Sequence, residues 1–346
     1  MGLTQKKADD VFCIVITTIQ APTAAVIRFS EEISSSHGTL VVVGDEKGPE
    51  SYDIKNCDFY SLQMQKGHSF LLSKLLPEGH YSRKNFGYLI AMQNGTSCIY
   101  ETDDDNAPLN NWRVRTKRVS ARMVRQSDWV NIYRAFSNDL IWPRGFALEK
   151  IGPSMDTALD ISDNDISIVA PIQQGLSAGS PDVDAIWRLI LNKEVSFAEG
   201  QCFFLPPGSW CPFNSQSTWW WPEAFPLLYL PSYCSFRMTD IWRSFIAQRC
   251  LWAMGHGVAF HSHEVYQDRN EHSLLDDFME EVPGYEMNGD MVRTLSGLEL
   301  DASEKAVGAN MFHCYRSLVS EGYLPESELE LVNAWLDDLT RLIGRV

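Results

Sequence analysis

The sequence predicts an α/β protein whose sheet is mostly parallel and is flanked by helices. Short, β-branched apolar runs alternate with helical stretches along the first hundred or so residues. These runs are apolar at nearly every position, which is typical of strands buried on both faces. The chain of 346 residues, 45% hydrophobic and 21% charged, is long enough and apolar enough to build a large core.

The N-terminal elements follow from local patterns. Val11–Ile19 is an apolar run of strand length, and Pro22 suits the start of a helix over Thr23–Ser34. Thr39–Val43 is a β-branched strand that ends in the polar turn 44–48. The pattern then predicts a strand over Asp58–Met64, helices over Phe70–Leu76 and Tyr81–Gln93, and a strand over Thr96–Thr102.

The chain changes in character after Asn110, where strands shorten and aromatic and proline content rises. We expect residues 1–110 and 111–285 to be two halves of one domain and residues 286–346 to be a helical C-terminal segment. His261–Asn270 is a polar segment. Helices are predicted over Ala185–Leu191, Met238–Trp252, Leu274–Met279, Lys305–Val319 and Ser327–Ile343, the last with Ser327 as its N-cap.

The most informative stretch is Ile99–Asn106, where an apolar strand runs into three consecutive aspartates. Adjacent carboxylates repel, so the cluster is either a solvated acidic turn or a site for a divalent cation. Mg²⁺ and Mn²⁺ prefer carboxylate oxygens and share their coordination shell with substrate phosphates. Asp103 and Asp105 can converge on one ion, while Asp104 points elsewhere. His263 is a further candidate ligand or a structural histidine.

Other polar residues lie at strand ends. Ligands of parallel sheets bind at the carboxyl ends of strands, so Thr17, Thr18 and Asp45 should line one crevice with the aspartates. The threonines are candidates for hydrogen bonds to a nucleotide base, although threonine is common at strand ends. Asp45 is a candidate contact to a ribose or base, or a turn-forming residue.

The net charge of the chain limits the kinds of ligand that it can bind. The formal net charge is −16, which disfavours nucleic-acid binding. An anionic substrate then needs a metal or a local basic patch, and the basic segment 113–118 is either such a patch or a solvated face. No apolar run reaches the length of a membrane span. We expect a soluble, cytoplasmic chain, or one in the Golgi lumen if a longer parent protein carries an anchor.

The acidic strand and the helix before it resemble the GT-A fold of nucleotide-sugar glycosyltransferases. Arg83–Ala91 is similar to the R-N-x-G-x-x-x-A helix that precedes the acidic motif in many of these enzymes. The family that the chain resembles is the STELLO-type glycosyltransferases, with no recognised motif after Tyr285. The resembling segments are Tyr81–Asn106, Asn131–Leu148, Ser180–Leu189, Phe213–Trp242 and Val265–Phe278.

A more distant likeness is to the reversibly glycosylated polypeptides, which are UDP-arabinopyranose mutases. Trp142–Leu148 is similar to their R-G-Y-P-F-S-L segment and places Arg144 on the arginine that is glycosylated there. Pro181–Ala185 is similar to their P-D-Y-D-A. The chain departs from this pattern at Glu149 and Lys150, which weakens the mutase interpretation more than the transferase interpretation.

The resemblance implies a metal-dependent glycosyltransferase that uses a UDP-sugar donor, Mn²⁺ or Mg²⁺, and a glycan or other hydroxyl acceptor. The alternatives are a UDP-sugar mutase with a glycosylated Arg144, or a non-catalytic scaffold; an oligomer is possible. The implied metal ligands are Asp103, Asp105 and His263. The implied catalytic residues are Asp240, Arg144 and Asp184, and the implied nucleotide-sugar contacts are Thr17, Thr18, Asp45, Arg83, Lys84, Asp104, Asp182 and Arg269.

Several of these residues have a structural alternative. Asp240 is either an acceptor contact and general base or the N-cap of a helix. Asp182 and Asp184 either bind sugar hydroxyls or cap the helix that follows them. Arg144, in an apolar stretch, needs a partner: a donor phosphate, a donor hydroxyl, or a carboxylate such as Asp182 or Asp184.

Overall fold

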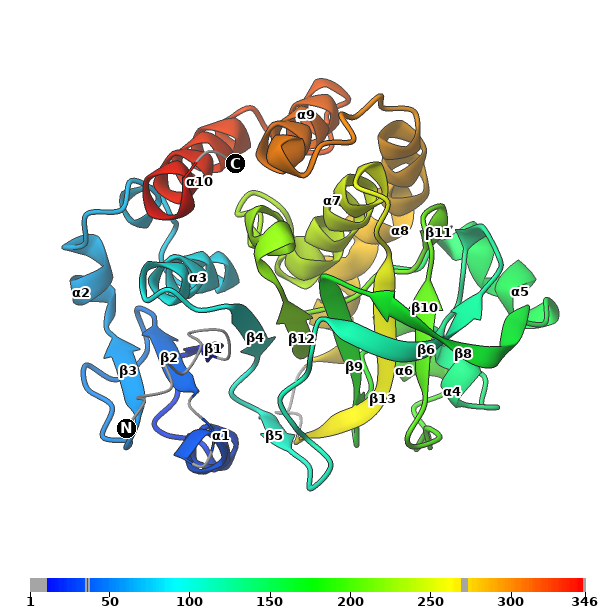
Figure 1. Cartoon of the computed structure of the whole chain (residues 1–346), viewed down its shortest axis with the longest axis horizontal. Coiled ribbons are helices and arrows are strands. Elements are labelled where there is room, and N and C mark those ends of the chain that lie inside the picture. The colour runs from blue at the N-terminus through cyan, green and yellow to red at the C-terminus, as the bar shows by residue number, and fades with distance from the viewer. Residues whose placement is uncertain (1–10, 35, 37, 269–272, 345–346) are drawn as a thin grey trace, which may run out of the picture.

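A sheet of eleven strands forms the centre of the computed structural model, which describes residues 11–34, 36, 38–268 and 273–344 (Figure 1). The first four strands in the chain that join this sheet are parallel and adjacent. In spatial order they are β3 (Cys57–Tyr60), β2 (Thr39–Gly44), β1 (Phe12–Thr18) and β4 (Cys98–Thr102).

The remaining strands extend the same sheet with mixed pairing. They are β5 (Asn106–Pro108), β6 (Arg118–Val124), β8 (Ile161–Val169), β9 (Ile172–Ala178), β10 (Cys202–Leu205), β12 (Ser217–Trp220) and β13 (Val258–Gln267). The full order is β3-β2-β1-β4-β12-β9-β13-β10-β6-β8, with β5 paired to β13. Because β12 lies antiparallel between β4 and β9, it joins the two halves. A separate ladder pairs β7 (Asp128–Trp129) with β11 (Ser209–Trp210).

Helices cover both faces of the sheet, so the expected α/β fold class is confirmed. Helix α1 (Ala24–Ser34) lies on one face, and α3 (Lys84–Gln93), α7 (Thr239–Ala253), α9 (Val307–Ser320) and α10 (Ser327–Ile343) lie on the other (Figure 1). The other α-helices are α2 (Leu62–Lys66), α4 (Tyr133–Phe136), α5 (Leu148–Asp156), α6 (Ala185–Ile190) and α8 (Leu274–Ser296). The 3₁₀ helices are η1 (Leu72–Lys74), η2 (Tyr81–Arg83), η3 (Pro222–Leu228), η4 (Phe236–Met238) and η5 (Glu304–Ala306).

The alternation of side chains in β1 explains this layering. Ile14 and Ile16 are buried with Phe29 of α1 on one face, whereas Cys13 and Val15 are buried with the α3 side chains on the other. Successive residues of a strand point to opposite faces, and the apolar run 12–16 of β1 therefore requires a layer on each side.

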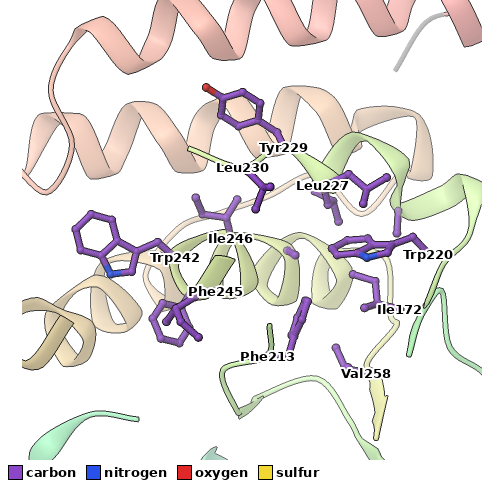
Figure 2. Close-up of a cluster of buried hydrophobic side chains, with 14 of the residues drawn as sticks. Ile172, Phe213, Trp220, Leu227, Tyr229, Leu230, Trp242, Phe245, Ile246 and Val258 are labelled. Atoms are coloured by element: carbon purple, nitrogen blue, oxygen red, sulfur yellow. The ribbon is translucent and has the colours of Figure 1, made fainter. Parts of the chain in front are cut away.

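Helix α7 is the centre of the larger core. Figure 2 shows Leu227 and Leu230 on one side of this helix and Phe213 and Val258 on the other. The C-terminal helices close over this layer, where the indole of Trp335 in α10 donates to the carbonyl of Pro226 at 2.9 Å. Within the described part of the chain, no helix is both long enough and apolar enough to cross a membrane.

Some predicted elements differ from those observed. The predicted strand 58–64 ends at Tyr60, because Ser61 caps α2 by accepting from the amide of Met64. The predicted helix 70–76 is only the short η1. The predicted helix 274–279 is the first part of α8, which continues to residue 296 and contains the expected boundary at 285.

One expected cap was wrong, and one segment forms a strand that the sequence did not predict. Ser327 is the first helical residue of α10, and Glu326 occupies the N-cap position without a side-chain hydrogen bond. The polar segment 261–270 is strand β13 as far as Gln267. Most of this strand is buried, and its buried Glu264 is paired with Arg115, which is distant in the sequence.

Candidate functional site

The three aspartates form a turn between β4 and β5, at the carboxyl end of a buried parallel strand. Asp103 accepts hydrogen bonds from the Tyr81 hydroxyl at 2.6 Å and from the Lys84 ammonium at 2.7 Å. The Lys84 side chain is completely buried and that of Asp103 is 23% exposed. Lys84, one of the predicted site residues, thus balances the charge of one aspartate of the turn.

Asp104 links the turn to the end of β1 and has different partners from Asp103. Its carboxylate accepts from the Thr18 hydroxyl, and its carbonyl accepts from Thr23. Burial raises the pKa of Asp104, while the Thr18 hydrogen bond opposes that shift. The neighbouring hydroxyl of Thr17 is buried and has no hydrogen-bond partner among the described residues. The first and fourth strands in the chain therefore meet at their carboxyl ends, as the polar strand ends predict.

Asp105 carries the largest resolved electrostatic perturbation of the turn. Its carboxylate accepts from the side chains of Gln267 at 3.0 Å and Asn106 at 2.8 Å. Burial, and next the charge of Asp103, raise the pKa of Asp105 to about 7. A cation bound at this turn would relieve the cost of ionising it.

The turn fits a divalent cation by the chemistry of its oxygen donors. Between residues 11 and 344, leaving out those not described, no group of three or more His, Cys, Asp or Glu side chains is placed to hold a metal. Asp103 and Asp105 would therefore need further ligands from a bound phosphate group. His263 lies elsewhere, with its Nε2 3.8 Å from a Glu199 oxygen.

Asp45 and Arg83 are used within the fold. The Asp45 carboxylate accepts from the amides of Gly79 at 2.9 Å and His80 at 2.8 Å. The buried Arg83 donates to the side chain of Gln65 at 2.8 Å and to loop carbonyls. Both residues hold the segment that delivers Tyr81 and Lys84 to the turn. Arg269 lies outside the described residues.

A second charged cluster surrounds Arg144. Its Nε donates to Asp182 at 2.8 Å, and its Nη1 and Nη2 donate to the two oxygens of Asp240 at 3.0 Å each. All three residues are buried. Burial opposes the charge of the guanidinium, but Asp182 and Asp240 outweigh it and raise the pKa of Arg144 well above its ordinary value. Arg144 is therefore a permanently charged partner of two carboxylates.

Neither catalytic aspartate expected near Arg144 is free. Asp240 is not the N-cap of α7, because the helix starts at Thr239 with Met238 in the cap position. Asp184 does cap α6, accepting from the amide of Trp187 at 2.8 Å and from the Trp142 indole at 2.7 Å. Burial raises the pKa of Asp184 to about 6, and the Trp187 amide opposes the shift.

The sequence patterns did not indicate one charged pair that lies beside the site. Glu101, two residues before Asp103, is fully buried and forms two 2.8 Å contacts with Arg243 of α7. Ser215 links this pair to Asp240, since its amide donates to Asp240 at 3.2 Å and its hydroxyl accepts from Arg243 at 3.0 Å. The available signals were a glutamate inside an apolar strand and the three-residue spacing of Asp240 and Arg243 on one helix face.

Sequence comparisons relate the chain to glycosyltransferases as a class. Two relatives from Arabidopsis thaliana are named "Probable glycosyltransferase STELLO1" and "Probable glycosyltransferase STELLO2". Each is 26% identical to this chain over 87% of its length, and the chain spans 41% of each relative. A mycobacterial protein of solved structure overlaps 93% of this chain and 77% of its own, with a TM-score of 0.41 and 9% identity.

The family model of the STELLO glycosyltransferases matches residues 237–345 of the chain. Together with the two relatives, this match confirms the resemblance that the sequence motifs indicated. The matched residues include part of η4 and all of α7, β13 and the C-terminal helices. The absence of family motifs after Tyr285 was therefore an incomplete interpretation, because the resemblance continues through α9 and α10.

Proposed function

We propose that the chain is a metal-dependent glycosyltransferase that transfers a sugar from a UDP-sugar to a glycan or another hydroxyl acceptor. One observation carries the proposal: the acidic turn 103–105 closes the carboxyl end of β4 beside Lys84 and Thr18. Such strand ends are where open α/β sheets bind nucleotides. The similarity to STELLO glycosyltransferases supports the reaction class.

In this proposal Asp103 and Asp105 hold Mn²⁺ or Mg²⁺. Once bound, the ion would supply Lewis-acid stabilisation of the negative charge that develops on the leaving diphosphate. Lys84 orients Asp103 and limits the repulsion between the aspartates. The buried hydroxyl of Thr17, without a partner in the described structure, is the natural hydrogen-bonding group for the nucleotide base.

The residues around Arg144 position the acceptor side. Arg144 fixes Asp240 through both carboxylate oxygens, so Asp240 is oriented to accept a hydrogen bond from an acceptor hydroxyl. Asp182 completes the pairing of Arg144, and Asp184 fixes the start of α6. We assign Arg144, Asp182 and Asp184 positioning roles and Asp240 the contact to the acceptor.

The mutase alternative requires Arg144 to act as a nucleophile. A guanidinium must lose a proton before it can attack a sugar carbon, and the two ion pairs raise its pKa. None of the contacts that the described residues make with Arg144 favours this chemistry, so the transferase is the function that we propose.

Turnover of UDP-sugars tests the proposal. Wild-type protein with Mn²⁺ should release UDP from at least one UDP-sugar, by transfer or slow hydrolysis. Asp103→Asn/Asp105→Asn should reduce the rate by about 100-fold or more, the scale on which loss of transition-state charge stabilisation acts. Asp163→Asn, at an exposed position of β8, is the matched control. A double variant as active as the control would refute the proposal.

A further inference from the structure

A hollow of about 620 Å³ lies away from the acidic turn and has no role in the proposed chemistry. It is formed by the segment 111–120, the loop 199–202 and residues 261–264 of β13. Its volume is that of a small-molecule site. The basic segment noted in the sequence supplies three arginines to its lining, Arg113, Arg115 and Arg118.

The hollow is locally basic although the protein has a net charge of −16. Arg115 is neutralised by the buried Glu264, with its Nε 3.0 Å from a carboxylate oxygen. Arg113 and Arg118 have no ion-pair partner among the residues that the structure describes. The other acidic lining residue, Glu199, is 78% exposed and lies near His263. Arginine charge in the hollow therefore exceeds carboxylate charge.

Two histidines form a largely buried part of the wall beside the exposed Arg113 and Arg118. His261 is buried, and its Nδ1 accepts from Arg115 at 2.9 Å while its Nε2 donates to Gln173 at 3.0 Å. Burial, together with Arg115 and Arg113, lowers the pKa of His261 well below its ordinary value. The ring is therefore neutral and fixes Arg115 in place. The Nδ1 of His263 is buried and has no hydrogen-bond partner in the described structure.

We propose that this hollow binds a sugar that carries an oxyanion, either a phosphate or a carboxylate. The forks of Arg113 and Arg118 suit such oxygens, and the unsatisfied nitrogen of His263 offers a further hydrogen bond. Strand β13 leads from His263 to Gln267, which donates to Asp105. Four residues of strand span about 13 Å. The ligand would thus lie at about that distance from the acidic turn, and its being a sugar rests on the proposed function.

Calorimetric titration in EDTA tests this site without the metal of the donor site. Glucose 6-phosphate and glucuronate are the charged probes, and glucose is the uncharged control. We expect at least one charged sugar to bind and glucose not to bind. The probe that binds identifies phosphate or carboxylate as the recognised group.

Arg113→Gln/Arg118→Gln locates the binding. This double variant should weaken the affinity for the charged sugar by about tenfold or more, because two charge-assisted contacts are lost. Arg125→Gln, an exposed arginine outside the hollow, should leave it unchanged. The proposal is overturned if neither charged sugar binds the wild type, or if the double variant binds as tightly as the control. A separate titration of UDP with Mn²⁺ reports on the donor site, so the two failures are distinguishable.

Discussion

At the residue scale, Asp105 links burial to function. Burial, and next the charge of Asp103, raise the pKa of Asp105 to about 7. Without a bound cation, Asp105 is therefore partly protonated at neutral pH. Metal ligation requires the ionised form. If Asp105 ligates the proposed cation, protons and the cation would therefore compete for the same carboxylate near neutral pH.

We predict that Mn²⁺ affinity rises with pH up to about 7 and then levels off. Below the pKa of Asp105 the ion must displace a proton, which costs up to about tenfold in affinity per pH unit. Titration calorimetry with Mn²⁺ at pH 5.5, 6.5, 7.5 and 8.0 measures this dependence. Asp105→Asn should bind more weakly and show a flatter profile. Equal affinities for the wild type across this range would exclude Asp105 as a ligand.

Arg144 is a buried cation, whereas Asp105 is a partly buried carboxylate. Its guanidinium compensates Asp182 and Asp240 in a buried site. We predict that Arg144→Gln lowers the free energy of unfolding by about 3–5 kcal/mol, since two buried carboxylates lose their partner. Urea denaturation measures the change, with Arg125→Gln as an exposed control that should shift by less than about 0.5 kcal/mol. A loss below about 1 kcal/mol would contradict a tightly coupled cluster.

At the element scale, α3 sets the position of Lys84. This helix packs so closely on the sheet that a Cβ added at Gly87 would lie 2.6 Å from a methyl carbon of Val15 and 2.8 Å from one of Val43. Gly87 is the glycine of the helix motif that precedes the aspartates. A larger residue would push α3, and with it Lys84, away from its place.

We predict that Gly87→Ala destabilises the protein by about 1–3 kcal/mol, as overpacking does in cores. Alanine has the higher helix propensity, so packing and propensity give opposite signs here. Gly67→Ala is the matched control, because a Cβ there would make only ordinary contacts of 3.6 Å or more. Thermal denaturation compares the two variants. A Gly87→Ala variant as stable as the wild type would show that α3 can shift without cost.

Local patterns explain which elements could be predicted. β1, β2, β4, α1 and α3 lie within a few residues of the predicted ranges, because their apolar periodicity is visible in short windows. β13 was missed, since its buried Glu264 is stabilised by Arg115, separated from it by 149 residues. The pairing of Arg144 with Asp182 was among the alternatives, whereas the role of Arg243 required the fold.

At the scale of the whole molecule, α10 joins segments from both halves of the sheet. Asp338 accepts from the amides of Leu71 at 3.0 Å and Leu72 at 2.9 Å. Glu328 accepts from the amides of Ser232 and Tyr233. The C-terminal helices are therefore part of the core architecture, consistent with a family match that runs to residue 345.

We predict that Asp338→Ala lowers the free energy of unfolding by about 1–3 kcal/mol, because two amides lose their acceptor. The neighbouring Asp337 is exposed and provides the control, Asp337→Ala, which should change stability by less than about 0.5 kcal/mol. Urea denaturation of both variants makes the comparison. Equal stabilities would mean that α10 contributes little to holding the loop 71–72.

We propose above all that the acidic turn forms a metal-dependent site for a UDP-sugar. The most direct test of this claim is calorimetric titration of UDP into the protein, first with Mn²⁺ and then with EDTA, for the wild type, Asp103→Asn/Asp105→Asn and the control Asp163→Asn. We predict binding by the wild type and the control with Mn²⁺ only, and none by the double variant. Metal-independent binding, no binding by the wild type, or unchanged binding by the double variant would contradict the claim.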